Sequence, residues 1–96
     1  MHVISKKKLK EFWGIHPGSK SALENWFKVL KGTKYETFND LKKTFPRADK
    51  VSGKIVFDVG GNKYRLITVI HFNRSKVFVR HVLTHKEYDK GEWKNG

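Results

Sequence analysis

The hydrophobic period of this chain changes at Pro46, and this change most limits the fold that the chain can adopt. Before Pro46 the apolar residues recur at the helical spacing of about 3.6, and after it they follow the strand spacing of two. Lys54–Val59 alternates and ends at Gly60-Gly61, which indicates a hairpin. Two more strands are predicted over 64–72 and 76–83, joined by the turn Asn73-Arg74-Ser75. The second half of the chain therefore predicts three consecutive strands.

The first half predicts a short strand and two helices. His2–Ile4 is the strand candidate, and Ser5 is the expected N-cap of the first helix. Apolar positions then recur at i, i+3, i+4 and i+7 in two segments: Leu9, Phe12, Trp13 and His16, and again Leu23, Trp26, Phe27 and Leu30. His16-Pro17-Gly18 separates the two helices. The second begins at Ser19 or Ser21 and ends at Lys31, with Gly32 as its C-cap.

These elements predict an α+β fold that forms a single domain over residues 1–96. A third, short helical segment is indicated by Phe38, Leu41 and Phe45, and Pro46 ends it. The N-terminal strand and an antiparallel helical hairpin pack on a small, mainly antiparallel sheet. We expect the helices to cover one face of that sheet and the other face to be open and functional. Residues 90–96 are expected to form a loosely held tail.

The charge of the chain indicates a polyanionic partner. The formal net charge is +12, with 21 Lys and Arg against 9 Asp and Glu. Nucleic acid or an acidic protein is the expected partner, and a solvated basic surface without a specific ligand is the alternative.

The chain has no Cys, which excludes disulfides and thiolate chemistry. It has neither a secretory signal nor a run of about 20 apolar residues, so we expect no membrane association and a cytoplasmic location.

One strand carries the first candidate site residues. Lys63 and Arg65 project to one side of the predicted strand, whereas Tyr64, Leu66, Thr68 and Ile70 project to the other. The second set is apolar enough to face the core, which places Arg65 on the open face. If the turn at 73–75 leaves two residues unpaired, Arg65 lies opposite Thr84, and a slip of one residue places it opposite His85. Tyr88 follows within one turn, and Arg80 lies roughly 13 Å further back along the last strand.

These side chains suit the cleavage of RNA without a metal, which needs a base for the 2′-OH, a positive clamp on the phosphorane and an acid for the leaving oxygen. Arg65 and Arg80 are the candidate clamp residues. His85 is the candidate for proton transfer, and Tyr88 for stacking on a base, orienting the 2′-OH or assisting proton transfer. The candidate RNA-binding residues are Lys54, Lys63 and Lys86. The histidines lack a ligand grouping, so no metal or cofactor is expected.

Each candidate also has a structural alternative. Lys63 pairs with Asp58 across the hairpin in one interpretation, and Arg80 belongs to a structural ion pair. His85 caps the terminal turn, and Tyr88 anchors the C-terminus against the sheet.

The chain resembles the HigB toxin family of type II toxin–antitoxin systems, within the larger RelE-like group. The resemblance is strongest in Val56-Phe57-Asp58-Val59-Gly60-Gly61-Asn62-Lys63-Tyr64-Arg65-Leu66 and in Thr84-His85-Lys86-Glu87-Tyr88-Asp89. It covers nearly the whole chain and includes Leu9…Phe12-Trp13, Phe45-Pro46 and Val79-Arg80. The two long motifs are specific in this order and spacing.

The resemblance implies a RelE-like fold and a metal-free, ribosome-dependent mRNA endonuclease that arrests translation. It further implies a HigA-like antitoxin with a helix-turn-helix, which binds operator DNA as a complex with the toxin. Arg65 matches the phosphate ligand of the group best, and His85 and Tyr88 match its C-terminal catalytic groups. RelE-like toxins differ in which residues act as base and acid, so both assignments stay open. The alternatives are a ParE-like toxin acting on DNA gyrase and a non-enzymatic basic RNA-binding module.

Overall fold

A five-stranded sheet with the order β1-β5-β4-β3-β2 forms the centre of the structure, a computed structural model that describes residues 1–95. The strands are β1 (His2–Ile4), β2 (Asp49–Val51), β3 (Lys54–Val59), β4 (Tyr64–His71) and β5 (Lys76–Thr84). The short strand β1 pairs in parallel with β5, and the other neighbours pair antiparallel. The predicted α+β class and mainly antiparallel sheet are confirmed.

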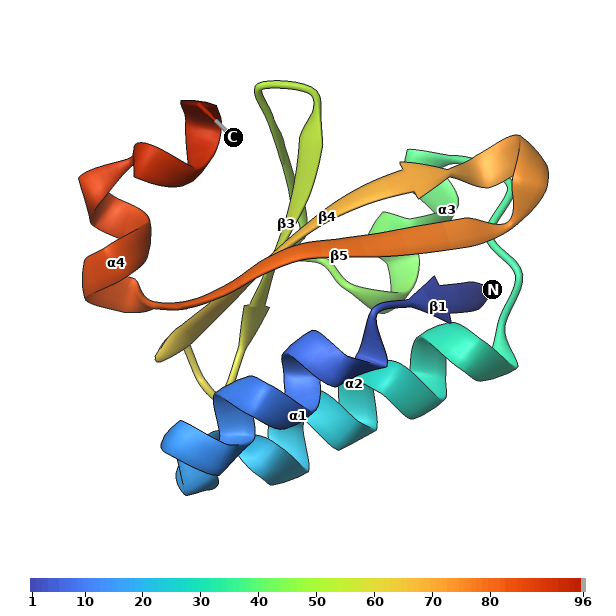
Figure 1. Cartoon of the computed structure of the whole chain (residues 1–96). Coiled ribbons are helices and arrows are strands. Elements are labelled where there is room, and N and C mark those ends of the chain that lie inside the picture. The colour runs from blue at the N-terminus through green and yellow to red at the C-terminus, as the bar shows by residue number, and fades with distance from the viewer. Residues whose placement is uncertain (96) are drawn as a thin grey trace.

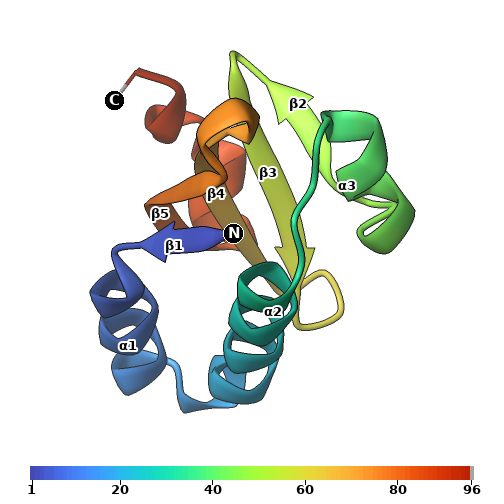
Figure 2. The same ribbon diagram turned by 90° about the vertical axis from the view of Figure 1, so that its right-hand side faces the viewer.

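The helices lie mostly on one side of this sheet. They are α1 (Lys6–Ile15), α2 (Lys20–Gly32), α3 (Phe38–Thr44) and α4 (His85–Lys90), with single 3₁₀ turns η1 (Pro17–Ser19), η2 (Phe72–Arg74) and η3 (Glu92–Asn95). Figures 1 and 2 show α1 and α2 side by side beneath the sheet, as an antiparallel pair. Within residues 1–95, no helix is long and apolar enough to cross a membrane.

The predicted N-cap position of α1 is confirmed, whereas the predicted C-cap of α2 differs from the structure. Ser5 is the N-cap residue of α1, but its backbone is left-handed (φ 76°) and its side chain makes no capping hydrogen bond. A capping side chain normally needs an extended backbone at this position. Gly32 is the last residue of α2 rather than its C-cap, and the extended Thr33 takes that place.

The core lies between the sheet and the α1–α2 layer. The apolar stripes of the two helices bury Leu9, Leu23, Trp26 and Leu30 against Leu66 and other side chains of the inner sheet face. Thr68, also on this face, is buried and donates its hydroxyl to the carbonyl of Ile55 at 2.9 Å. The predicted alternation along β4 is therefore confirmed, and it directs Arg65 to the opposite face.

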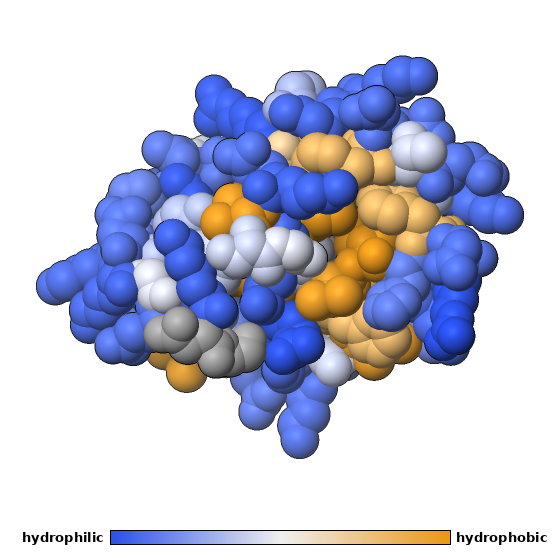
Figure 3. All heavy atoms as spheres, turned by 90° about the horizontal axis from the view of Figure 1, so that it is seen from above, coloured by the Kyte–Doolittle hydropathy of each residue, from blue (hydrophilic) through white to orange (hydrophobic). Residues whose placement is uncertain are grey.

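The prediction of an open outer face and a loose tail is wrong near α4. Trp93 of η3 is only 4% exposed and packs on Val56 and Ile67 of the outer face. A large indole and two aliphatic side chains gain more from mutual burial than from exposure to water, which holds the C-terminal segment on the sheet. Beyond this cover, Figure 3 shows apolar side chains bordered by hydrophilic ones, and the cross-strand pair Val69 and Phe78 is half-buried on this face.

The predicted register of the last hairpin is also wrong. Arg65 lies opposite Leu83, and Thr84 lies opposite Tyr64. The ladder ends at the pair His71 and Lys76, so the connection leaves residues 72–75 unpaired rather than two. The register then shifts between Ile67 and Thr68, whose partners are His81 and Val79. Arg80 therefore lies in a bulge without a partner in β4.

Trp93→Ala tests the packing of the C-terminal segment. We expect the free energy of unfolding to fall by about 3 kcal/mol, because a buried indole is removed and leaves a cavity. Urea denaturation measures the change, and Lys94→Ala, at an exposed neighbour, is the control with little expected effect. Equal midpoints for the two variants would contradict the packing described above.

Candidate active site

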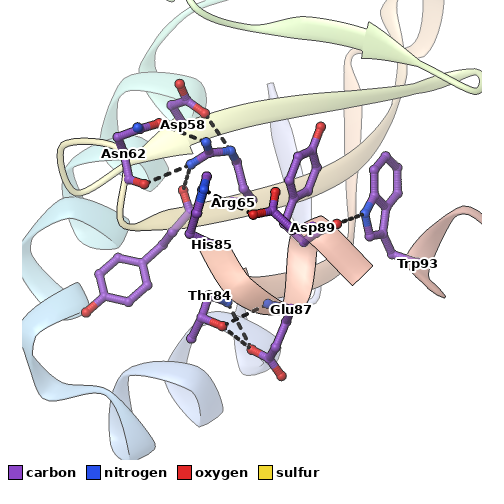
Figure 4. Close-up of polar contacts among 10 residues, drawn as sticks. Asp58, Asn62, Arg65, Thr84, His85, Glu87, Asp89 and Trp93 are labelled. Carbon is purple, nitrogen blue, oxygen red and sulfur yellow. Dashed lines mark hydrogen bonds and ion pairs between the residues drawn. The ribbon is translucent and has the colours of Figure 1, made fainter. Parts of the chain in front are cut away.

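A buried arginine holds the β3–β4 hairpin. Arg65 is 8% exposed, and its Nε donates to the carboxylate of the cross-strand residue Asp58 at 2.9 Å. Its two terminal nitrogens donate to Asn62, at 2.8 Å to Oδ1 and 3.1 Å to the carbonyl, and one also donates to the carbonyl of Tyr64 at 3.3 Å. Figure 4 shows Asp58 and Asn62 around the guanidinium. The turn itself needs left-handed backbone at Gly60, Gly61 and Asn62, which explains these residue types.

Tyr88 is held next to this arginine. The guanidinium carbon of Arg65 lies 5.2 Å from the centre of the Tyr88 ring, and Trp93 stacks on the same ring with centroids 5.1 Å apart. The Trp93 indole also donates to the carbonyl of Tyr88 at 3.0 Å. Burial raises the pKa of the Tyr88 hydroxyl, an effect that the Arg65 charge opposes. The hydroxyl therefore stays protonated at neutral pH and is a hydrogen-bond donor.

A capping box starts α4 at a fixed position. The backbone N–H of Glu87 donates to the Thr84 hydroxyl at 3.2 Å, and the Glu87 carboxylate accepts from the backbone N–H of Thr84 at 2.9 Å. The hydrogen bond from the Thr84 backbone lowers the pKa of the Glu87 carboxyl. Gly91, with φ 73°, ends the helix. Thr84, and not His85, is thus the cap, so the capping alternative for His85 is wrong.

His85 is the first residue of α4 and carries an acidic neighbour. Its Nε2 lies 3.2 Å from Oδ2 of Asp89, one helical turn later, and the two side chains are 51% and 60% exposed. When Asp89 accepts from Nε2–H, the neutral ring presents Nδ1 as a proton acceptor. The backbone N–H of His85 donates to the carbonyl of Lys63 at 3.0 Å, which fixes the start of α4 against the β3–β4 turn.

The structure brings together five of the seven predicted site residues. Lys63 is the last residue of the β3–β4 turn and Lys86 is the second residue of α4, and both are exposed. The N–H of His85 bonds this turn to the start of α4, and Tyr88 of the same helix lies against Arg65. Two residues lie apart. Lys54 begins β3, four residues or roughly 13 Å from Asp58. Arg80 is exposed in the bulge of β5, where its carbonyl accepts from Nζ of Lys8 at 3.0 Å.

Several residues of the site were not predicted from the sequence. Asp58 pairs with Arg65, whereas the sequence interpretation paired it with Lys63. A four-residue turn over 60–63 would have placed Asp58 opposite Arg65. The spacing of His85 and Asp89 is a readable i, i+4 signal on a short helix. Trp93 gave no signal, because a lone aromatic near a terminus has no periodicity.

Comparison with known proteins identifies the family. Residues 19–91 match the HigB_toxin family model, described as the RelE-like toxic component of a toxin–antitoxin system. The chain belongs to the HigB toxin family. It is 37% identical over 93 residues to mRNA interferase HigB from Escherichia coli O6:H1, covering 94% of this chain and 90% of that protein. It is 34% identical over 92 residues to the mRNA interferase toxin HigB of E. coli K12, covering 93% and 88%.

Membership of the HigB family agrees with the position of the two sequence motifs. The first motif builds the β3–β4 hairpin with its Asp58–Arg65 pair, and the second builds the capped helix α4. The matched segment includes both of them. The resemblance predicted from the motifs is therefore confirmed, and with it the toxin class.

Glu87→Gln tests the capping box through its pH dependence. A carboxyl whose pKa is lowered in the folded state stabilises the fold above its unfolded pKa of about 4.5, and this contribution is lost as the pH falls through the folded pKa. We expect the variant to lose less stability than the wild type between pH 6 and pH 3, measured as the urea midpoint. Glu11→Gln, on the exposed face of α1, is the matched control and should follow the wild type. Identical pH profiles for all three proteins would contradict the role of Glu87.

Proposed function

We propose that this chain is a metal-independent, ribosome-dependent mRNA endonuclease that arrests translation as the toxin of a type II toxin–antitoxin system. The two relatives named mRNA interferases, each aligned over most of both chains, support the activity. The observation that carries the proposal is the exposed His85–Asp89 pair, which lies on the same short helix as Tyr88 and next to Lys63. A proton acceptor, a proton donor and positive charge are thus supplied by α4 and the turn to which it is bonded.

In the proposed reaction, His85 acts as the base. Nδ1 of the neutral ring takes the proton of a ribose 2′-OH, whose oxygen attacks the adjacent phosphorus. Asp89 keeps the ring oriented and stabilises the imidazolium that forms. The bond from phosphorus to the 5′-oxygen breaks, which leaves a 2′,3′-cyclic phosphate and a 5′-hydroxyl. Tyr88, which burial keeps protonated by raising its pKa, transfers its proton to the leaving 5′-oxygen, and this proton completes the 5′-hydroxyl.

The Lys and Arg side chains have different roles in the proposed reaction. Lys63 and Lys86 are exposed and stabilise the charge that grows on the phosphorane. Arg65 makes four polar contacts inside the protein with its three nitrogens. We therefore propose that it places Tyr88 and offers a remaining N–H group to the phosphate. Lys54 lies roughly 13 Å along β3 from Asp58, and Arg80 lies roughly 13 Å along β5 from Thr84. In this proposal the two side chains contact neighbouring phosphates of the same RNA.

In this proposal the ribosome positions the mRNA, which the small site cannot do with its few contacts. A substrate held in position by the translating ribosome needs few contacts from the toxin, since proximity lowers the barrier. The proposed partners are mRNA on the ribosome, a HigA-like helix-turn-helix antitoxin, and operator DNA through the complex of the two. Acting on translated mRNA, the chain works in the cytoplasm as a single toxin domain.

His85→Gln tests the assignment of the base. We expect cleavage of mRNA on translating ribosomes to slow by about 10²–10⁴-fold, because the amide cannot take the 2′-OH proton. Asp89→Asn should slow it less, by about 10-fold or more, since it only orients the ring. Both changes lie at half-exposed positions, so the urea midpoint should stay close to that of the wild type.

His71→Gln, an exposed histidine at the far end of β4, is the matched control and should cleave normally. Wild-type cleavage by His85→Gln would show that another group is the base. Growth arrest with intact mRNA and an induced DNA-damage response would instead indicate action on gyrase.

A further inference from the structure

A second basic feature lies at the opposite end of the sheet from α4. A hollow of about 820 Å³ opens between β1, the first turn of α1, the second half of α2 and the η2 connection. Figures 1 and 2 show the start of β1 between the η2 connection and α2. Nothing in the proposed cleavage chemistry uses this hollow.

The formally charged side chains that line the hollow are all cationic. Lys6, Lys31 and Arg74 line it and are exposed, and no Asp or Glu is among its lining residues within 1–95. The ammonium of Lys6 lies 4.3 Å from the centre of the Phe27 ring, and that of Lys31 lies 5.9 Å from it. Neither lysine makes an ion pair within the described residues. Carboxylates from outside would therefore meet charges that the protein does not neutralise itself.

The floor of the hollow is apolar. Met1 and Val3 are buried there, and the half-buried ring of Phe27 forms one wall. Backbone contacts hold these walls in place, since the N–H of His2 donates to the carbonyl of Ser75 at 2.8 Å and the amino group of Met1 donates to that of Leu30 at 2.9 Å. A preformed apolar floor inside a basic rim suits a bulky apolar side chain flanked by carboxylates. RNA phosphates would satisfy the rim but leave the floor unused.

The hollow is also well separated from the candidate active site. Arg74 and Ser75 precede β5, and His85 follows it, so the nine residues of β5 place roughly 26 Å between the two ends. A partner seated in the hollow would leave His85 uncovered, which allows the two surfaces to be tested independently.

We propose that this hollow is the docking site for an acidic segment of the antitoxin, with one bulky apolar side chain seated on Phe27 and carboxylates on Lys6, Lys31 and Arg74. The family supplies the kind of partner, because this chain is the toxic component of a toxin–antitoxin pair. The net charge of +12 favours an acidic segment. This inference rests on the membership of the toxin family. The proposed mRNA cleavage enters only as a control measurement in the test below.

The test compares two double charge reversals with the same change in net charge. Lys6→Glu with Lys31→Glu places acids on the rim, and Lys10→Glu with Lys28→Glu changes exposed lysines on the same two helices outside the hollow. The probe is the purified cognate antitoxin, titrated by calorimetry against each full-length toxin. We expect the rim variant to bind at least 100-fold more weakly and the control to stay within about threefold of the wild type.

Cleavage of mRNA on ribosomes and the thermal unfolding midpoint are measured on the same proteins. The rim variant should keep both, and cells expressing it should no longer be rescued by the antitoxin. A wild-type Kd for the rim variant overturns the proposal, as does equal weakening of the two variants, which would indicate long-range attraction only. Loss of cleavage with retained antitoxin binding also overturns it and assigns the hollow to RNA. If the wild type itself fails to cleave mRNA, the proposed function fails while the comparison of Kd values still stands.

Discussion

The ion pair between Asp58 and Arg65 is the interaction on which the candidate active site depends. A guanidinium this deeply buried is tolerated only with a counter-charge and satisfied donors, and breaking such a pair costs about 3–5 kcal/mol when one charge is left alone. The same arginine closes the β3–β4 turn through Asn62 and lies against the ring of Tyr88. Tyr88 in turn stacks on Trp93, which covers the outer sheet face. One buried charge thus connects the hairpin, α4 and the C-terminal segment.

This arrangement explains how a 96-residue chain can present catalytic groups on a helix of only six residues. Such a helix is not stable by itself in water. The capping box of Thr84 and Glu87 starts it, the hydrogen bond from His85 to Lys63 attaches it to the turn, and the ring of Tyr88 anchors it. Rigid support leaves His85 and Asp89 exposed where a substrate can reach them. The basic hollow at the far end of β5 is then free for a different partner.

The sequence predicted the elements well and their connections less well. The hydrophobic periodicity identified α1, α2 and the strands, because it reflects which residues are buried. For the same reason, the alternation along β4 correctly placed Leu66 and Arg65 on opposite faces of the sheet. The register of β4 with β5 was missed, since it depends on the unpaired residues 72–75 and the bulge at Arg80, and turn geometry sets both. The cover by Trp93 was missed because a single residue carries no pattern. The motifs found His85 and Tyr88, whereas Asp58 and Asn62 became evident only as neighbours of Arg65.

Amide hydrogen exchange in Asp58→Asn tests this dependence most directly. The substitution keeps the size of the side chain and removes the negative charge beside Arg65. The N–H groups of His85 and Gly91, which donate to Lys63 and Tyr88, should exchange about 10-fold or more faster than in the wild type, while core amides such as that of Val77 change far less. Asp49→Asn, an exposed carboxylate on the same sheet face, should leave both rates unchanged. Unchanged exchange at His85 and Gly91 in Asp58→Asn would contradict the account, because α4 would then be held in place without the buried pair.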